Sequence, residues 1–176
     1  LYALRHPENV LSYIGTGQVI SMMENERTAF QEVWKMAEKA GNRKHLLALG
    51  NLGDYPPDDP ELLLKKLPKL RKIQAAYDNG PGSGSGQGEL LKLLRRSPSF
   101  RWNDLIGLIR VMKVNHPLHL QLLSFALTDY PSHYQTPVHY ILGEADTIAP
   151  TSLGKAYFDT IDAPRKTITV IPGAGH

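Results

Sequence analysis

Two short segments near the end of the chain, each rich in β-branched residues, constrain the fold more than any other feature. One covers Val138–Leu142, the other covers Lys166–Ile171, and each is followed by a turn that contains glycine. Between them, Thr151–Ile161 carries apolar residues at four-residue spacing, which is typical of a helix. A strand, a helix and a second strand in so short a stretch predict two parallel strands joined by a right-handed crossover.

Each of these two segments is followed by one ionisable side chain that could take part in catalysis. Asp146 comes after the first segment and His176 comes after the second. Ligands of an open parallel sheet lie beyond the carboxyl ends of its strands, so we expect the two side chains to meet at one rim. A carboxylate within hydrogen-bonding reach of an imidazole fixes its tautomer and stabilises the imidazolium formed during proton transfer. Taken alone, Asp146 could be a turn or cap residue and His176 a polar terminal residue; together they predict the acid and the general base of a hydrolase.

The first residues of the chain predict a further part of the same α/β unit. Leu1–His6 has the pattern of the end of a helix, which Pro7 terminates because proline disfavours helical geometry in the residue before it. Val10–Ile14 is a short apolar segment closed by Gly15–Gly17, and we expect a strand there. The end of this strand should lie at the same rim as the two ionisable side chains.

The middle of the chain has a helical pattern instead. Its apolar spacing predicts helices at 28–40, 42–49, 61–77, 89–96, 102–114 and 118–128. Asp59 should cap the third of these, with Pro60 at the first helical position, and Pro68 should kink it. The glycine-rich stretch at 81–88 predicts a flexible loop.

These patterns together predict an α/β fold with about three parallel strands and flanking helices, interrupted by a large all-helical insertion. Residues 1–17 and 135–176 would form the core of this fold. Residues 18–134 would form a cap or lid, because an insertion of that size between neighbouring strands has to lie outside the sheet.

Composition narrows the classes of function. There is no cysteine, so a cysteine nucleophile and cysteine metal ligands are excluded within these residues, and the redox compartment and disulfides are undetermined. The net charge is only +3, and a basic helix face around Lys65–Lys72 is typical of a solvated surface, so we expect neither nucleic-acid nor membrane binding. His116 and His119 lack a glutamate at metal-site spacing. We therefore expect no metal and no cofactor.

The residues at the two ends of the chain resemble a known family. Residues 2–10, Tyr-Ala-Leu-Arg-His-Pro-Glu-Asn-Val, are similar to the helix after a nucleophile elbow and the strand that follows it. Residues 143–146, Gly-Glu-Ala-Asp, are similar to an acid loop. The most specific matches are 156–166, Ala-Tyr-Phe-Asp-Thr-Ile-Asp-Ala-Pro-Arg-Lys, and 173–176, Gly-Ala-Gly-His. On these residues the chain resembles the α/β-hydrolase superfamily, and within it the proline iminopeptidase-like branch.

The resemblance implies the C-terminal portion of an α/β-hydrolase with a Ser–Asp–His triad. Asp146 would be the acid, His176 the general base, and the serine would lie upstream of Leu1 in a Gly-x-Ser-x-Gly elbow. The implied activity is that of a serine hydrolase acting by acyl transfer, an aminopeptidase on short peptides, with these 176 residues inactive on their own. Such enzymes bind the free amino terminus of the substrate through acidic cap residues, and Glu24, Glu26 and Glu32 lie in a suitable region.

Two other functions remain open from the sequence. One is an esterase or an epoxide-hydrolase-type enzyme acting on a small apolar substrate, the latter with an aspartate nucleophile. The other is a catalytically dead, hydrolase-like binding module that uses its helical cap as an interaction surface. In each enzymatic case the expected partner is a small peptide or small molecule, and the expected location is cytoplasmic.

Overall fold

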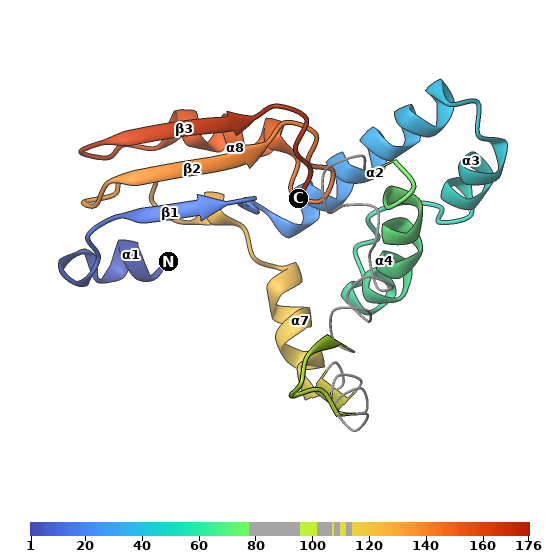
Figure 1. The fold of residues 1–176 in the computed structure, drawn as a ribbon, viewed down its shortest axis with the longest axis horizontal. Coiled ribbons are helices and arrows are strands. Elements are labelled where there is room, and N and C mark those ends of the chain that lie inside the picture. The colour runs from blue at the N-terminus through green and yellow to red at the C-terminus, as the bar shows by residue number, and fades with distance from the viewer. Residues whose placement is uncertain (78–95, 102–106, 108–109, 112–113) are drawn as a thin grey trace.

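The computed structural model describes residues 1–77, 96–101, 107, 110–111 and 114–176 (Figure 1). The expected loop at 81–88 lies outside the described residues. The same is true of most of the two helices expected at 89–96 and 102–114.

A parallel sheet of three strands forms one end of the described structure. Its strands are β1 (Tyr13–Thr16), β2 (Val138–Gly143) and β3 (Lys166–Ile171), in the order β1-β2-β3. Both pairings are parallel, and Tyr140 of β2 lies between Gly15 of β1 and Ile168 of β3. Helix α8 (Thr151–Thr160) connects β2 to β3. The strand–helix–strand prediction for the end of the chain is thus confirmed.

The strand expected at Val10–Ile14 is wrong in its position. The short helix α1 (Tyr2–Arg5) leads into a 3-10 turn, η1 (Pro7–Asn9). Val10 donates its N–H to the carbonyl of Pro7 and ends that turn, and Leu11 is 97% exposed. Pairing with β2 begins only at Tyr13, so the apolar character of Val10 and Leu11 reflects neither strand pairing nor core packing.

The core of the α/β part lies between the sheet and α8. Val138, Tyr140 and Leu142 alternate along β2 and point into this core, as expected for one face of a strand. The ring of Tyr140 packs against Phe158 of α8, with 5.4 Å between centroids. The remaining buried members of the cluster are Ile20, Leu127, Tyr134, Tyr157 and Ile161.

The described part of the 18–134 segment is mainly helical. It contains α2 (Met22–Lys39), α3 (Arg43–Gly50), α4 (Pro60–Gln74), α7 (His116–Leu123) and the 3-10 turn η2 (Leu127–Asp129). The segment has a hydrophobic cluster of its own, formed by Val33, Ala37, Leu49, Leu52, Leu70 and Ile73. Within the described ranges, none of the helices is both long and apolar enough to cross a membrane.

Helix ends in this segment differ from expectation where capping was not recognised. α2 begins at Met22 rather than Thr28, because Ser21 accepts the N–H of Glu24 and caps it there. α7 ends at Leu123, and the chain then turns through η2, so the helix expected at 118–128 is too long.

Helix α4 begins as expected. Asp59 caps it by accepting the N–H of Glu61, with Pro60 at the first position. The helix continues through Pro68.

Helix α2 lies beyond the carboxyl ends of the strands. In Figure 1 the three arrows point toward α2, and the C-terminus of the chain lies beside the first turns of that helix. Asn25 of α2 and Gln74 of α4 contact the loop that follows β2. Residues that follow each strand therefore meet the helical segment at one edge of the sheet.

Candidate active site

The structure brings Asp146 and His176 together. His176 Nδ1 lies 2.9 Å from Asp146 Oδ2. The aspartate side chain is 1% exposed and the histidine side chain is 42% exposed. Asp146 follows β2 and His176 follows β3, and these neighbouring parallel strands end at the same edge of the sheet. The contact expected from the strand ends is therefore present, while the catalytic role of the pair stays a prediction.

Backbone contacts between the two turns hold the pair in place. Glu144 donates its N–H to Ile171 over 3.0 Å, and Ala145 donates to Ala174 over 2.8 Å. A Cβ atom at Gly143 would lie 2.3 Å from the carbonyl oxygen of Gly175. Only glycine at position 143 leaves room for the C-terminal turn, and this close approach carries His176 over the end of β2.

Gly17, just after β1, packs against the imidazole. Its φ is +51°, a left-handed conformation that favours glycine. A Cβ atom there would lie 2.9 Å from Cε1 of His176. Gly17, Asp146 and His176, which follow the three strands, therefore lie together at one edge of the sheet, as the sequence predicts.

Backbone N–H groups orient the Asp146 carboxylate. Oδ1 accepts hydrogen bonds from the N–H of Ile148 at 2.9 Å and from the N–H of Ala149 at 2.8 Å. Oδ2 is the oxygen that contacts His176. A carboxylate oxygen only accepts, so Nδ1 carries the hydrogen and Nε2 of the neutral ring keeps its lone pair. This tautomer is the one that can take a proton from a nucleophile.

A pocket of about 320 Å³ borders the pair. Its lining includes Thr16, Gly17, Gly143, Asp146, Gly175 and His176. A half-exposed imidazole beside a pocket can be reached by a substrate, whereas the buried carboxylate behind it cannot. Over the described residues, no group of three or more histidine, aspartate or glutamate side chains is arranged to hold a metal ion.

The three carboxylates considered for binding an amino terminus are dispersed. Glu24 pairs with Arg27 on the surface, and buried Glu26 pairs with Arg71. Glu32 lines a separate pocket of about 400 Å³, which Glu144 and Asp146 also line. Burial raises the pKa of Glu32, nearby Lys35 lowers it and the Asp146 charge raises it further. None of the three lines the pocket beside His176.

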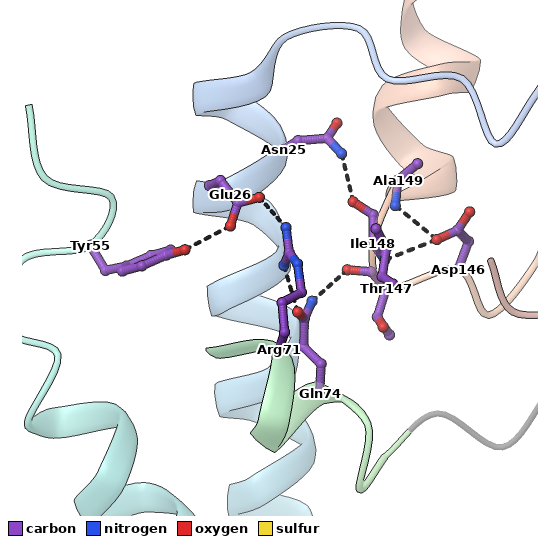
Figure 2. Close-up of polar contacts among 9 residues, drawn as sticks. All are labelled: Asn25, Glu26, Tyr55, Arg71, Gln74, Asp146, Thr147, Ile148 and Ala149. Atoms are coloured by element: carbon purple, nitrogen blue, oxygen red, sulfur yellow. Dashed lines mark hydrogen bonds and ion pairs between the residues drawn. The ribbon is translucent and has the colours of Figure 1, made fainter. Parts of the chain in front are cut away.

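Two polar residues at the site, Asn25 and Gln74, were missed by sequence reasoning, and Glu26 was assigned a different role. Asn25 of α2 and Gln74 of α4 donate to backbone carbonyls directly after the acid loop, and Arg71 and Glu26 lie behind them (Figure 2). One signal was available: Ser21 and Glu24 have the spacing of a capping box, which would have extended α2 over Asn25 and Glu26. No local pattern marks Gln74.

Comparisons with known proteins add little to this description. No family model matches the chain, and no curated protein matches it. Among solved structures, the esterase RhEst1 from Rhodococcus sp. ECU1013 is similar, with 17% sequence identity and a TM-score of 0.43. The alignment covers 95% of this chain and 49% of that one, so the chain spans about half the length of the structure it matches. A similarity at this level assigns neither a family nor an activity.

Proposed function

We propose that this chain carries the acid and the base of an α/β-type hydrolase that acts by acyl transfer. One observation carries the proposal: the buried Asp146 carboxylate holds the half-exposed His176 imidazole at 2.9 Å, at the carboxyl edge of a parallel sheet. The two hydrogen bonds to Oδ1 support it, because they leave Oδ2 free for the histidine.

In the proposed reaction His176 acts through Nε2. It takes the proton of a hydroxyl nucleophile as that group attacks the acyl carbon, and later gives the proton to the leaving group. Asp146 keeps the ring in the required tautomer and stabilises the imidazolium. Among the described residues, no hydroxyl is hydrogen-bonded to His176, and we propose that a serine preceding Leu1 supplies it. On this proposal the 176 residues alone are inactive.

We propose that the substrate is a small ester or amide and, more specifically, a short peptide. The resemblance to the proline iminopeptidase-like branch favours peptides. The structure gives that specificity little support, because Glu24 and Glu26 are already paired with arginines. Glu32 is the member of the expected set that lies beside the acid loop.

Labelling with a fluorophosphonate tests the proposal in the full-length protein. We expect rapid labelling, and we expect His176→Ala to abolish it while His133→Ala leaves it unchanged. A folded protein that does not label but opens an epoxide would have an aspartate nucleophile instead. A folded protein that does neither would be a binding module.

The substrate class is tested separately. Release of product from prolyl- or alanyl-arylamides would support aminopeptidase activity. Turnover of p-nitrophenyl esters without release from the arylamides would make the protein an esterase.

A further inference from the structure

The acid loop (143–146) continues into residues 147–149, and this continuation is held from the helical segment by two side-chain amides. Gln74 Nε2 donates to the carbonyl of Thr147 at 2.8 Å, and Asn25 Nδ2 donates to the carbonyl of Ile148 at 2.7 Å. Gln74 is 2% exposed and Asn25 is 3% exposed. Figure 2 shows the two amides approaching the loop on one side while Asp146 approaches it on the other.

The amides and Asp146 contact the same two peptide groups. The carbonyl of Thr147 and the N–H of Ile148 belong to one peptide plane; Gln74 binds its carbonyl and Asp146 Oδ1 binds its N–H. The next plane joins the carbonyl of Ile148 to the N–H of Ala149, and it is bound by Asn25 and by Asp146 in the same way. Because a peptide group is planar, a donor that fixes its carbonyl direction also fixes its N–H direction.

The Gln74 amide is itself held by a partly buried ion pair, in which Glu26 is buried and the Arg71 side chain is 27% exposed. Arg71 Nη1 donates to Gln74 Oε1 at 2.5 Å, which turns the NH₂ group toward Thr147. Another nitrogen of Arg71 binds Glu26, whose side chain is 1% exposed. Tyr55 donates its hydroxyl to the other Glu26 oxygen at 2.6 Å. Burial, and then the hydrogen bond to Glu26, raise the pKa of Tyr55, so the hydroxyl keeps its proton and remains a donor.

An ion pair with one buried member is a poor source of stability. Removing the Glu26 charge from water offsets much of the attraction to Arg71, and well-packed apolar residues are often as stabilising. Hydrogen bonds in a buried network do fix the orientation of the groups they join. The Gln74 amide is bonded at both its oxygen and its nitrogen, whereas Asn25 Oδ1 has no partner among the described residues and Asn25 is held through its nitrogen. Here the members end on the two peptide groups that hold the Asp146 carboxylate.

We propose that Gln74 and Asn25 are positioning residues for His176, acting through these two peptide groups and Asp146. Arg71 and Glu26 set the direction of the Gln74 amide. The inference rests on the proposed function of Asp146 and His176 as acid and base. On this inference, the helical segment helps to position the catalytic pair.

Kinetics and NMR on the full-length protein test this inference. Gln74→Leu removes the donor and keeps most of the volume, and Gln31→Leu is the same change at an exposed position of α2. We expect Gln74→Leu to lower kcat by about 10- to 100-fold with KM changed less than about twofold, because a small displacement of a catalytic group has effects of this size. The NMR signal of the His176 Nδ1 proton should shift or broaden. Gln31→Leu should change neither.

A second pair of variants covers the case in which Gln74→Leu does not fold. Arg71→Lys keeps a cation beside Glu26 but loses the forked contact with Gln74, and should lower kcat with little change in Tm. Arg27→Lys makes the same change in the exposed pair with Glu24 and should have no effect.

The outcomes separate this inference from the proposed function. If Asp146→Asn abolishes turnover while Gln74→Leu and Arg71→Lys leave kcat and the Nδ1 signal unchanged, the inference is overturned and the proposed function stands. If Asp146→Asn leaves turnover unchanged, the proposed function fails. A kcat that falls only in proportion to the folded fraction, with an unchanged Nδ1 signal, also overturns the inference.

Discussion

A histidine–aspartate pair lies at each end of the unit formed by β2 and β3, with one member of each pair next to each strand. At the amino ends, His133 Nδ1 lies 2.7 Å from Asp162 Oδ2, and the side chains are 67% and 77% exposed. At the carboxyl ends, His176 and Asp146 lie 2.9 Å apart, with the aspartate side chain 1% exposed. The pair at the amino ends has the shorter contact, so the distance between the two side chains does not distinguish a candidate site from a surface ion pair.

The surroundings of the two aspartates account for the difference. Asp146 has a second oxygen bonded to two backbone N–H groups, and a glycine packs against the imidazole that it holds. Asp162 contributes its backbone to a short extension of the sheet, through hydrogen bonds with Ser132 and Tyr134, and leaves its side chain in water. An exposed pair of this kind contributes about 1 kcal/mol or less to stability. A fixed and desolvated carboxylate can hold an imidazole in one orientation.

Removing the charge from each aspartate in turn should give the largest difference in kcat between the two ends of the strands. In the full-length protein we expect Asp146→Asn to lower kcat by about 10³- to 10⁴-fold, because an amide can stabilise the wrong imidazole tautomer. Asp162→Asn should leave kcat within about twofold, since the exposed pair has little influence on structure. Steady-state kinetics on a reactive ester measure both. Equal losses in the two variants would mean that the carboxyl-edge pair has no special role.

Adding a methyl group beside the imidazole should have the next largest effect. Gly17→Ala would place a Cβ atom 2.9 Å from His176 Cε1 and displace the ring. We expect kcat to fall by about 10- to 100-fold, as is typical when a catalytic group is shifted by a fraction of an ångström or more.

Gly41→Ala is the matched control for that change. Gly41 also has a positive φ, +61°, but nothing lies within 4 Å of its added Cβ. Both variants should lose about 1 kcal/mol of stability through backbone strain, and only Gly17→Ala should lose activity. If the two lose activity equally, the contact between Gly17 and the imidazole is not what matters.

The sequence predicts the contact between the two carboxyl-edge residues well, for a simple reason. Parallel strands bring their carboxyl ends to one edge, so a residue after each strand is placed without knowledge of side-chain packing. The bounds of β3 agree with the prediction, and β2 differs by one residue. β1 was placed too early because a run of apolar residues does not show where backbone pairing begins.

The positioning network is not predictable in the same way. Asn25 reaches the residues after the acid loop from a position 123 residues earlier in the chain, and Gln74 does so from 73 residues earlier. Their partners are backbone carbonyls, which carry no sequence information. In the sequence, Gln74 follows Leu70 and Ile73 and looks like a polar residue at the edge of the apolar face of an amphipathic helix. Only the packing of α4 against the loop reveals its partner.

The smallest expected effect concerns Glu32, whose pKa is raised in part by the charge of Asp146. Burial raises its pKa above the usual 4.5, Lys35 lowers it and Asp146 raises it. A raised carboxyl pKa means that ionisation is less favourable in the folded protein than in the unfolded chain. The penalty is therefore absent below about pH 4 and develops as the pH rises through the raised pKa. Glu32→Gln should then stabilise the protein at pH 7 by about 0.5 kcal/mol or less, since the side chain is partly exposed.

Urea denaturation at about pH 4 and pH 7 measures this gain, and a second background identifies its source. If the Asp146 charge contributes, Glu32→Gln should gain less at pH 7 when combined with Asp146→Asn, and the same amount when combined with Asp162→Asn. A gain that is identical in all three backgrounds would assign the effect to burial alone. A gain that shrinks only with Asp146→Asn would assign part of the effect to the charge of Asp146, which acts on Glu32 across the pocket that both residues line.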